Sequence, residues 1–314
     1  MAKNPGLIYD HMPSAQTLFR IRIIDAQTYD LVRQGISRMK PLLWLRDGRN
    51  VKRIEQAQTP EEVLDMVPLA SGLGELAWHA QMRKLGPEAL PLIAVALKQA
   101  VEIRDENVRD KCMAHLIAEL RWRGQAGAQV LMEGFEALDD FGRSLACVVL
   151  GLLGARPARG LIWSYYQEVK QNLEESDFIG ALWGLVDLRD ERASEALAGL
   201  LATGQDFFEL YGFLSRAGDA SAVVPLLSLA STLPKEDQVG PMMSLVGIAH
   251  RIGREALVSE IEKAAAGEES RKEYEALADI VLSKPASLGE EYFATFYRGI
   301  RPDDVAGVLD HLAS

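Results

Sequence analysis

Apolar residues recur with a helical period along most of the chain. Leu90, Ile93, Ala94 and Leu97 fall at positions i, i+3, i+4 and i+7, which places them on one face of a helix. The uncharged run 144–155 is apolar at nearly every position, and this pattern predicts a helix that neighbours cover on most sides. The sequence has no long alternating runs between turn residues, so little β-sheet is expected.

From residue 70 onward the same turn pattern returns. An apolar helical run ends in Leu-Gly or a close variant, a short polar turn follows, and a second amphipathic run begins. Six turn positions are equivalent by this pattern, at spacings of 38, 30, 35, 29 and 35 residues: Gly86, Gly124, Gly154, Arg189, Gly218 and Gly253. Such a period holds two helices of about three to four turns and two short connections. The pattern therefore predicts about six helix pairs.

The residues of each turn fit a helix end followed by a helix start. The first helices are expected at residues 113–120, 142–153, 179–188, 207–215 and 239–252, and the second helices at residues 89–100, 128–137, 158–170, 193–201, 222–231 and 255–265. Glycine after a first helix can take the left-handed conformation that ends it. Asp190 and Asp219 can cap the next helix through their carboxylates, and Pro87 and Pro157 lie where no backbone donor is needed.

The two ends of the chain do not follow this period. Residues 18–24 alternate partly, which favours either a short strand or the approach to a helix. Thr59-Pro60-Glu61-Glu62 has the residues of a helix start. Because terminal repeats of a solenoid are atypical, we expect three regions. They are an N-terminal cap or adaptor at residues 1–69, repeats at 70–268, and a C-terminal helical cap at 269–314.

The turns resemble HEAT-like repeats of the broad bacterial class that includes the phycobilin-lyase type. The resemblance is carried by Leu85-Gly86-Pro87-Glu88-Ala89-Leu90 and by residues 217–227, which begin Ala-Gly-Asp-Ala-Ser-Ala. It covers about residues 70–268, and Arg189 and the uneven spacing mark the repeats as degenerate. The resemblance implies an all-α protein, an α-solenoid of about six stacked helix pairs with atypical caps. It also implies a concave face lined by the second helices, which usually binds another protein.

Charge is unevenly distributed along the 314 residues. The formal net charge is −11, yet residues 1–60 hold 10 lysines and arginines against 5 acids, while the rest hold 24 against 40. An acidic body is poorly suited to neutralise phosphates, so nucleic acid is not expected as a partner. The basic N-terminal segment either packs on the chain's own acidic repeats or binds a partner with an acidic surface.

Cysteine usage and hydropathy predict a cytoplasmic chain with no membrane span. Cys112 and Cys147 lie in apolar helical stretches and form no disulfide framework, which suits a reducing compartment. Residues 1–6 lead into no apolar segment of the signal-peptide kind. The run 144–155 has 12 residues, too few to cross a bilayer.

Sequence motifs give no convincing catalytic or metal site. Gly72-Leu73-Gly74 lacks a preceding strand, and the Ser-x-x-Lys at residues 37–40 lacks companion motifs. None of the five histidines has a His or Cys at i+4, which argues against zinc. None is followed by Glu, which argues against the di-iron centre of HEAT-like hydroxylases. We interpret His79 and His115 as hydrogen-bonded structural residues, and we expect no catalytic residue, metal or cofactor.

Two groups of residues are candidates for partner binding. The first follows one stripe of a second helix at i, i+3 and i+7, and it consists of Trp163, Tyr166 and Lys170. Aromatic anchors of this kind suit a binding face, although the same residues could pack on the next repeat. The second group is basic with one aromatic residue, and it comprises Arg33, Arg38, Lys40, Trp44, Arg46, Arg49, Lys52 and Arg53. Such a stretch can grip phosphates or an acidic protein.

These features favour a non-catalytic scaffold for protein–protein interaction, or an accessory subunit of a larger complex. Binding would use the concave face, the basic N-terminal segment, or both. The alternative is a HEAT-like enzyme or cofactor chaperone of the chromophore-lyase type. A third reading, an enzyme resembling alkylpurine DNA glycosylases, is disfavoured because those proteins use a basic concave channel and residues 61–314 carry a net charge of −16.

Overall fold

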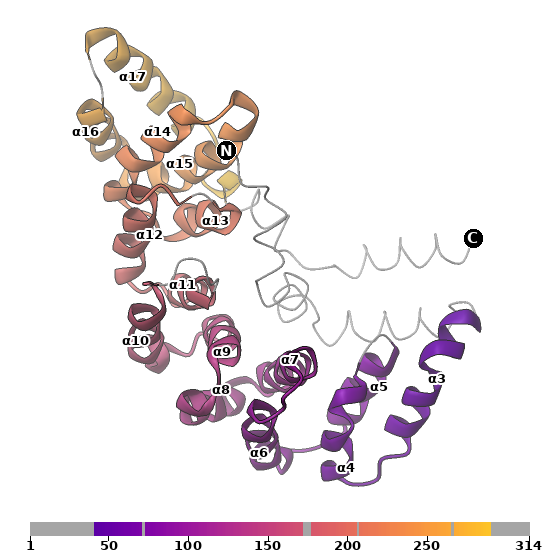
Figure 1. The fold of residues 1–314 in the computed structure, drawn as a ribbon. Coiled ribbons are helices and arrows are strands. Elements are labelled where there is room, and N and C mark those ends of the chain that lie inside the picture. The colour runs from indigo at the N-terminus through magenta and orange to yellow at the C-terminus, as the bar shows by residue number, and fades with distance from the viewer. Residues whose placement is uncertain (1–40, 71–72, 172–176, 206, 265–266, 290–314) are drawn as a thin grey trace. The chain divides into compact units, whose positions relative to one another are not determined.

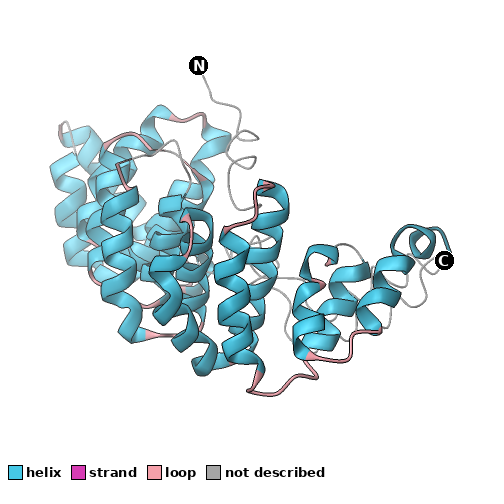
Figure 2. Ribbon diagram, turned by 60° about the horizontal axis from the view of Figure 1, so that its bottom comes forward, coloured by secondary structure: helices cyan, strands magenta, loops and turns pink. Residues whose placement is uncertain are grey.

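The protein is seen in a computed structural model that describes residues 41–70, 73–171, 177–205, 207–264 and 267–289. Within these ranges every regular element is a helix and no strand occurs, so the expectation of an all-α protein is confirmed (Figure 2). The possible strand at residues 18–24 lies outside the described residues. Among the described helices, none combines the length and the apolar character that crossing a membrane requires.

The chain divides into two compact units, with the boundary inside one helix between Gly184 and Leu185. In the first unit the helices are α3 (Pro41–Glu55), α4 (Pro60–Asp65), α5 (Leu73–Met82), α6 (Ala89–Val101), α7 (Glu106–Trp122), α8 (Gly124–Gly134), α9 (Asp140–Leu152), α10 (Arg159–Val169) and the first part of α11 (Asp177–Asp187). α5 packs on α3, α6 on α4 and α8, and α7 on α9 (Figure 1). In these contacts a helix packs on the helix two places along the chain.

The second unit repeats this alternation. It contains the end of α11, α12 (Arg192–Ala202), α13 (Phe208–Ala217), α14 (Val223–Thr232), α15 (Val239–Ile252), α16 (Arg254–Ala264) and α17 (Glu268–Leu282). α12, α14 and α16 pack in sequence, and α15 lies between α13 and α17. Every first and second helix expected from the sequence overlaps one of these helices, and most bounds agree within two residues. The largest difference is at α7, which begins at Glu106 rather than at the expected residue 113.

The predicted left-handed turns are confirmed at four of the six positions. The backbone φ angle is 59° at Gly124, 63° at Gly154, 53° at Arg189 and 82° at Gly253. Arg189 is the one described residue other than glycine with a positive φ, so the turn geometry persists even where glycine is missing. Gly218 instead has an extended backbone, with φ −60° and ψ 147°.

The predicted caps are also present. The Asp190 carboxylate accepts a hydrogen bond from the Arg192 backbone N–H at 3.0 Å, and Asp219 accepts one from the Ser221 N–H at 2.9 Å. At Thr59 both halves of a capping box form with Glu62. These polar side chains satisfy backbone donors that a helix start otherwise leaves unpaired.

The core follows the apolar pattern of the sequence. Every residue of α9 from Ser144 to Gly151 is buried, as expected for a helix covered on most sides. Cys112 and Cys147 are free and buried, and burial raises the pKa of the Cys147 thiol well above its ordinary value. Both thiols therefore serve as core side chains.

Candidate functional site

The aromatic residues predicted to bind a partner are partly inside the protein. Tyr166 on α10 is only 4% exposed, and burial raises its pKa to about 12. The Trp163 ring is half-buried, with its centroid 5.5 Å from that of Tyr166, and Lys170 is also half-buried. Trp163 and Lys170 are thus the members of this stripe that retain accessible surface, and a binding role for the stripe stays a prediction.

The basic group is described only in part. Arg33, Arg38 and Lys40 lie outside the described residues, and Trp44 and Arg46 lie on α3 without a description of their side chains. The side chains of Arg49, Lys52 and Arg53 are exposed, while Val51 and Ile54 of the same helix are buried. Since α3 packs on α5, the helix turns an apolar face inward and these three basic side chains outward.

A cluster of ionisable side chains that the sequence analysis did not predict lies between α5 and α7. Glu75 and His79 are four residues apart on α5, and His115 and Glu119 are four residues apart on α7, so each pair occupies one helix face. Their exposed fractions are 8%, 4%, 5% and 1%. Four ionisable side chains this deeply buried require partners, because an isolated buried charge is costly.

The cluster is organised as a chain of hydrogen bonds. Glu119 Oε1 lies 2.5 Å from His79 Nδ1, and His79 Nε2 lies 3.3 Å from His115 Nδ1. His115 Nε2 in turn lies 2.8 Å from the backbone carbonyl oxygen of Ala70. Both nitrogens of both imidazole rings therefore have a polar neighbour within hydrogen-bonding distance.

Aromatic rings surround the two histidines. The His79 ring lies 5.0 Å from the Trp78 ring and 5.0 Å from the Trp122 ring, measured between centroids. Trp78 is fully buried and donates from Nε1 to the Val63 carbonyl at 2.7 Å. The Arg83 guanidinium covers Trp122 at 4.0 Å. These contacts restrict the imidazole rings to one orientation.

The donor and acceptor roles in the cluster follow from its hydrogen-bond partners. A carbonyl only accepts, so His115 donates from Nε2 to Ala70. An ionised Glu119 also only accepts, so His79 donates from Nδ1. With both rings neutral, two nitrogen lone pairs then face each other across 3.3 Å. The arrangement needs one further cation, and either an added proton or a metal ion would supply it.

The cluster also groups possible metal ligands. One carboxylate oxygen of Glu75 and one ring nitrogen from each of His79 and His115 all lie within 4.8 Å of one another. Neither histidine has a His or Cys at i+4, and neither is followed by Glu, so local motifs did not indicate this group. A pattern in the sequence that could have indicated the cluster is Glu-x-x-x-His at residues 75–79. The same two residue types follow in reverse order, His-x-x-x-Glu, at residues 115–119.

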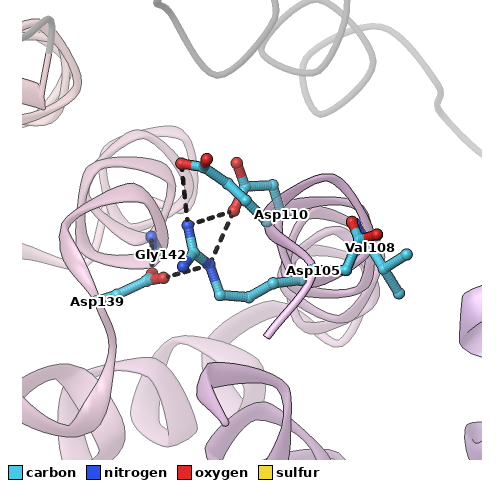
Figure 3. A network of polar contacts seen from close by, with 7 residues as sticks. Asp105, Val108, Asp110, Asp139 and Gly142 are labelled. Atoms are coloured by element: carbon cyan, nitrogen blue, oxygen red, sulfur yellow. Dashed lines mark hydrogen bonds and ion pairs between the residues drawn. The ribbon is translucent and has the colours of Figure 1, made fainter. Parts of the chain in front are cut away.

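A second polar network lies where α7 and α9 begin (Figure 3). Arg109 Nε lies 2.9 Å from Asp139 Oδ2, and Arg109 Nη2 lies 3.0 Å from Asp110 Oδ1. Asp139 also accepts from the Gly142 N–H at 2.9 Å, and Asp105 accepts from the Val108 N–H at 3.1 Å. Burial raises the pKa of Asp110, although Arg109 opposes this. Asp105 caps α7 and Asp139 caps α9, and the ion pair of Asp139 with Arg109 joins the two helices.

Comparison with known proteins gave no relatives. No family model, curated protein or solved structure matches the chain.

Proposed function

We propose that the chain is a scaffold for protein–protein interaction, or an accessory subunit of a larger complex, built as an α-solenoid of HEAT-like helix pairs. Solenoid repeats contact mainly their neighbours, and they present extended surfaces that suit protein binding. The layered packing within each unit and the left-handed turns at the repeat positions support this proposal. It does not depend on any catalytic group.

The observation that carries the proposal is a contact that recurs between helix pairs. Arg123, at the end of α7, donates to the carbonyl oxygens of Gly86 at 3.0 Å and Met82 at 3.1 Å, where α5 ends. Arg251, near the end of α15, donates to the carbonyls of Gly218 and Ser215, where α13 ends. An arginine of one pair thus caps the preceding pair in both units, as expected if one repeat was copied along the chain.

The exposed basic side chains of α3 are the binding surface we propose for an acidic partner. Arg49, Lys52 and Arg53 form no ion pair with any other described residue, so their charge is available to a partner. Charge complementarity of this kind accelerates association and selects partners. A partner of the acidic repeats would instead be neutral or basic.

The test compares two triple variants by quantitative affinity purification from native lysate. We expect Arg49→Glu with Lys52→Glu and Arg53→Glu to lower recovery of partners about tenfold, since three exposed pairs contribute about 0.5 kcal/mol each. The matched control changes three exposed basic residues outside α3, Lys98, Arg104 and Lys284, to Glu. Equal loss in both variants would reject the α3 surface. Recovery of the chain alone under gentle conditions would reject the scaffold proposal.

A HEAT-like enzyme or cofactor chaperone remains the second proposal, and one observation favours it. The buried Glu75–His79–His115–Glu119 cluster is the kind of polar group that a scaffold does not require. An absorption spectrum of the purified chain tests for a bound chromophore. A spectrum with only protein bands would reject the chromophore-lyase form of this proposal.

A further inference from the structure

We propose that Glu75, His79 and His115 bind a divalent transition-metal ion, with Glu119 and the Ala70 carbonyl orienting the two histidines. The ion would lie between α5 and α7 and would join the first helices of two neighbouring helix pairs. This inference is independent of the scaffold proposal, because it rests on the interior of the first unit.

The spacing of the two imidazole nitrogens suits a shared ion. Two ligands about 2.1 Å from one tetrahedral ion are about 3.4 Å apart. His79 Nε2 and His115 Nδ1 are 3.3 Å apart. The Glu75 carboxylate lies within 4.8 Å of a ring nitrogen of each histidine, so a modest side-chain adjustment brings it to the same ion.

The outer contacts of both rings are those of metal-binding histidines. A histidine that binds a metal through one nitrogen usually donates from the other to a carboxylate or a backbone carbonyl. Here His79 Nδ1 lies 2.5 Å from Glu119, and His115 Nε2 lies 2.8 Å from the Ala70 carbonyl. These contacts fix the tautomers so that the two remaining nitrogens present lone pairs to each other.

Charge balance also favours a divalent ion. Two ionised glutamates and two neutral imidazoles carry −2 in total, which a divalent cation neutralises. The formal charges of these four side chains thus match a divalent cation.

The donor set indicates the class of metal. Two imidazoles and one carboxylate suit Zn²⁺ and the first-row ions Fe²⁺, Co²⁺ and Ni²⁺, whereas Mg²⁺ and Ca²⁺ prefer oxygen ligands. Three protein ligands leave at least one position for water or another ligand, which is the coordination of a catalytic rather than a structural zinc site.

The experiment uses the full chain, stripped with a chelator and titrated with Zn²⁺ and then with Co²⁺ as a spectroscopic probe. We expect one equivalent per chain by elemental analysis, visible Co²⁺ bands of low-coordinate geometry, and a rise in Tm of about 5 °C with excess Zn²⁺. Glu75→Gln should weaken binding about 100-fold, and Glu119→Gln should weaken it about 10- to 100-fold by releasing the His79 ring.

Two control variants separate this site from nonspecific binding. Glu209→Gln changes a buried glutamate of the second unit, and His250→Ala removes an exposed histidine, and neither should alter metal affinity. Circular dichroism establishes that each variant is folded. A folded chain that takes up no stoichiometric Zn²⁺ would overturn the proposal, as would equal affinity in a folded Glu75→Gln variant. The cluster would then be a hydrogen-bonded pair that shares one proton.

Discussion

The first helices of neighbouring pairs meet in different ways in the two units. Between α5 and α7 the contact contains large polar side chains, with His79 and His115 enclosed by tryptophan rings. Between α13 and α15 small residues lie at the contact instead, and a Cβ on Gly247 would lie 2.2 Å from the Ser215 carbonyl oxygen. Ser244 hydrogen-bonds the Tyr211 carbonyl directly at 2.8 Å.

The difference lies in the size and polarity of the side chains at the two helix–helix contacts. Where the backbones approach closely, glycine and serine lie at the contact. Where aromatic and imidazole rings separate the helices, a buried polar cluster has room to form. The α5–α7 contact is thus a place in the first unit where ionisable side chains gather.

The largest effect is expected from breaking the polar contact. Glu119→Ala leaves the His79 ring without its acceptor, and truncating one member of a buried charged pair costs about 3 kcal/mol or more. Urea unfolding measures this loss. Glu55→Ala, which removes an exposed glutamate of α3, should stay within about 0.5 kcal/mol. Similar losses in the two variants would mean that the Glu119–His79 pair contributes nothing.

The small-residue contact should break with a single methyl group. Gly247→Ala places a Cβ against the Ser215 backbone, and overpacking of this kind costs about 1–3 kcal/mol. The matched control is Gly199→Ala on α12, where a Cβ meets no atom within 4 Å. That substitution should stabilise the chain by about 0.5–1 kcal/mol through helix propensity. Thermal unfolding of both variants checks the opposite signs, and a stabilising Gly247→Ala would refute the close contact.

The arginine caps should be equivalent in the two units. Arg123→Met and Arg251→Met each leave carbonyl groups without their charged donor, and we expect losses of about 1–2 kcal/mol from each. Arg254→Met is the control, because its pair with Asp279 is exposed and contributes less than about 0.5 kcal/mol. Unfolding curves compare the three. A loss confined to one unit would separate the two contacts that we consider equivalent.

The smallest effect concerns one buried glutamate and depends on pH. Burial raises the pKa of Glu209 above its ordinary 4.5, so the folded chain holds this proton to higher pH than the unfolded chain does. The folded state therefore loses stability as the pH rises above about 4.5. Glu209→Gln should remove this loss and stabilise the chain by about 1 kcal/mol at pH 7, with a smaller gain at pH 4. Urea unfolding at both pH values measures the difference.

Asp219 provides the opposite sign as a control. Burial alone would raise its pKa, but hydrogen bonds from Ser221 and Ser194 outweigh burial and lower it below 3.8. Its contribution to stability is therefore present above pH 3.8 and is lost as the pH falls through the lowered value. Asp219→Asn should destabilise the chain at pH 7. If both variants shift stability in the same direction at pH 7, the assignment of the two pKa shifts is wrong.

Local patterns predicted the helices and most turns, because the helical period and the glycine caps act over a few residues. Arg189 was placed by the repeat spacing alone, and it takes the left-handed conformation without glycine. Gly218 has an extended backbone instead, and a Cβ added there would lie 2.7 Å from the Leu214 carbonyl oxygen and 3.0 Å from the Ile248 side chain. The local sequence Ala217-Gly218-Asp219 does not distinguish this extended conformation from the left-handed one.

The polar cluster could not be predicted by the same means. His79 and His115 are 36 residues apart, and only the packing of α7 beside α5 brings their rings together. Tyr166 similarly lies at a helical spacing from Trp163 that suggested one exposed stripe, yet the fold buries it. Residues about one repeat apart become neighbours in a stacked architecture, so a search across the repeat period is the way to find such sites.

The arginine caps make the completion of a helix end depend on residues that are synthesised later. The carbonyl oxygens that end α5 receive their donor only when Arg123 has been made, 37 residues after Gly86. At about 5–20 residues per second a ribosome needs roughly 2 to 7 s for this interval. During synthesis the carbonyls that end α5 are therefore hydrated until Arg123 has been added, and those that end α13 until Arg251 has been added. A pause in translation within that interval prolongs the exposure of an incomplete helix end.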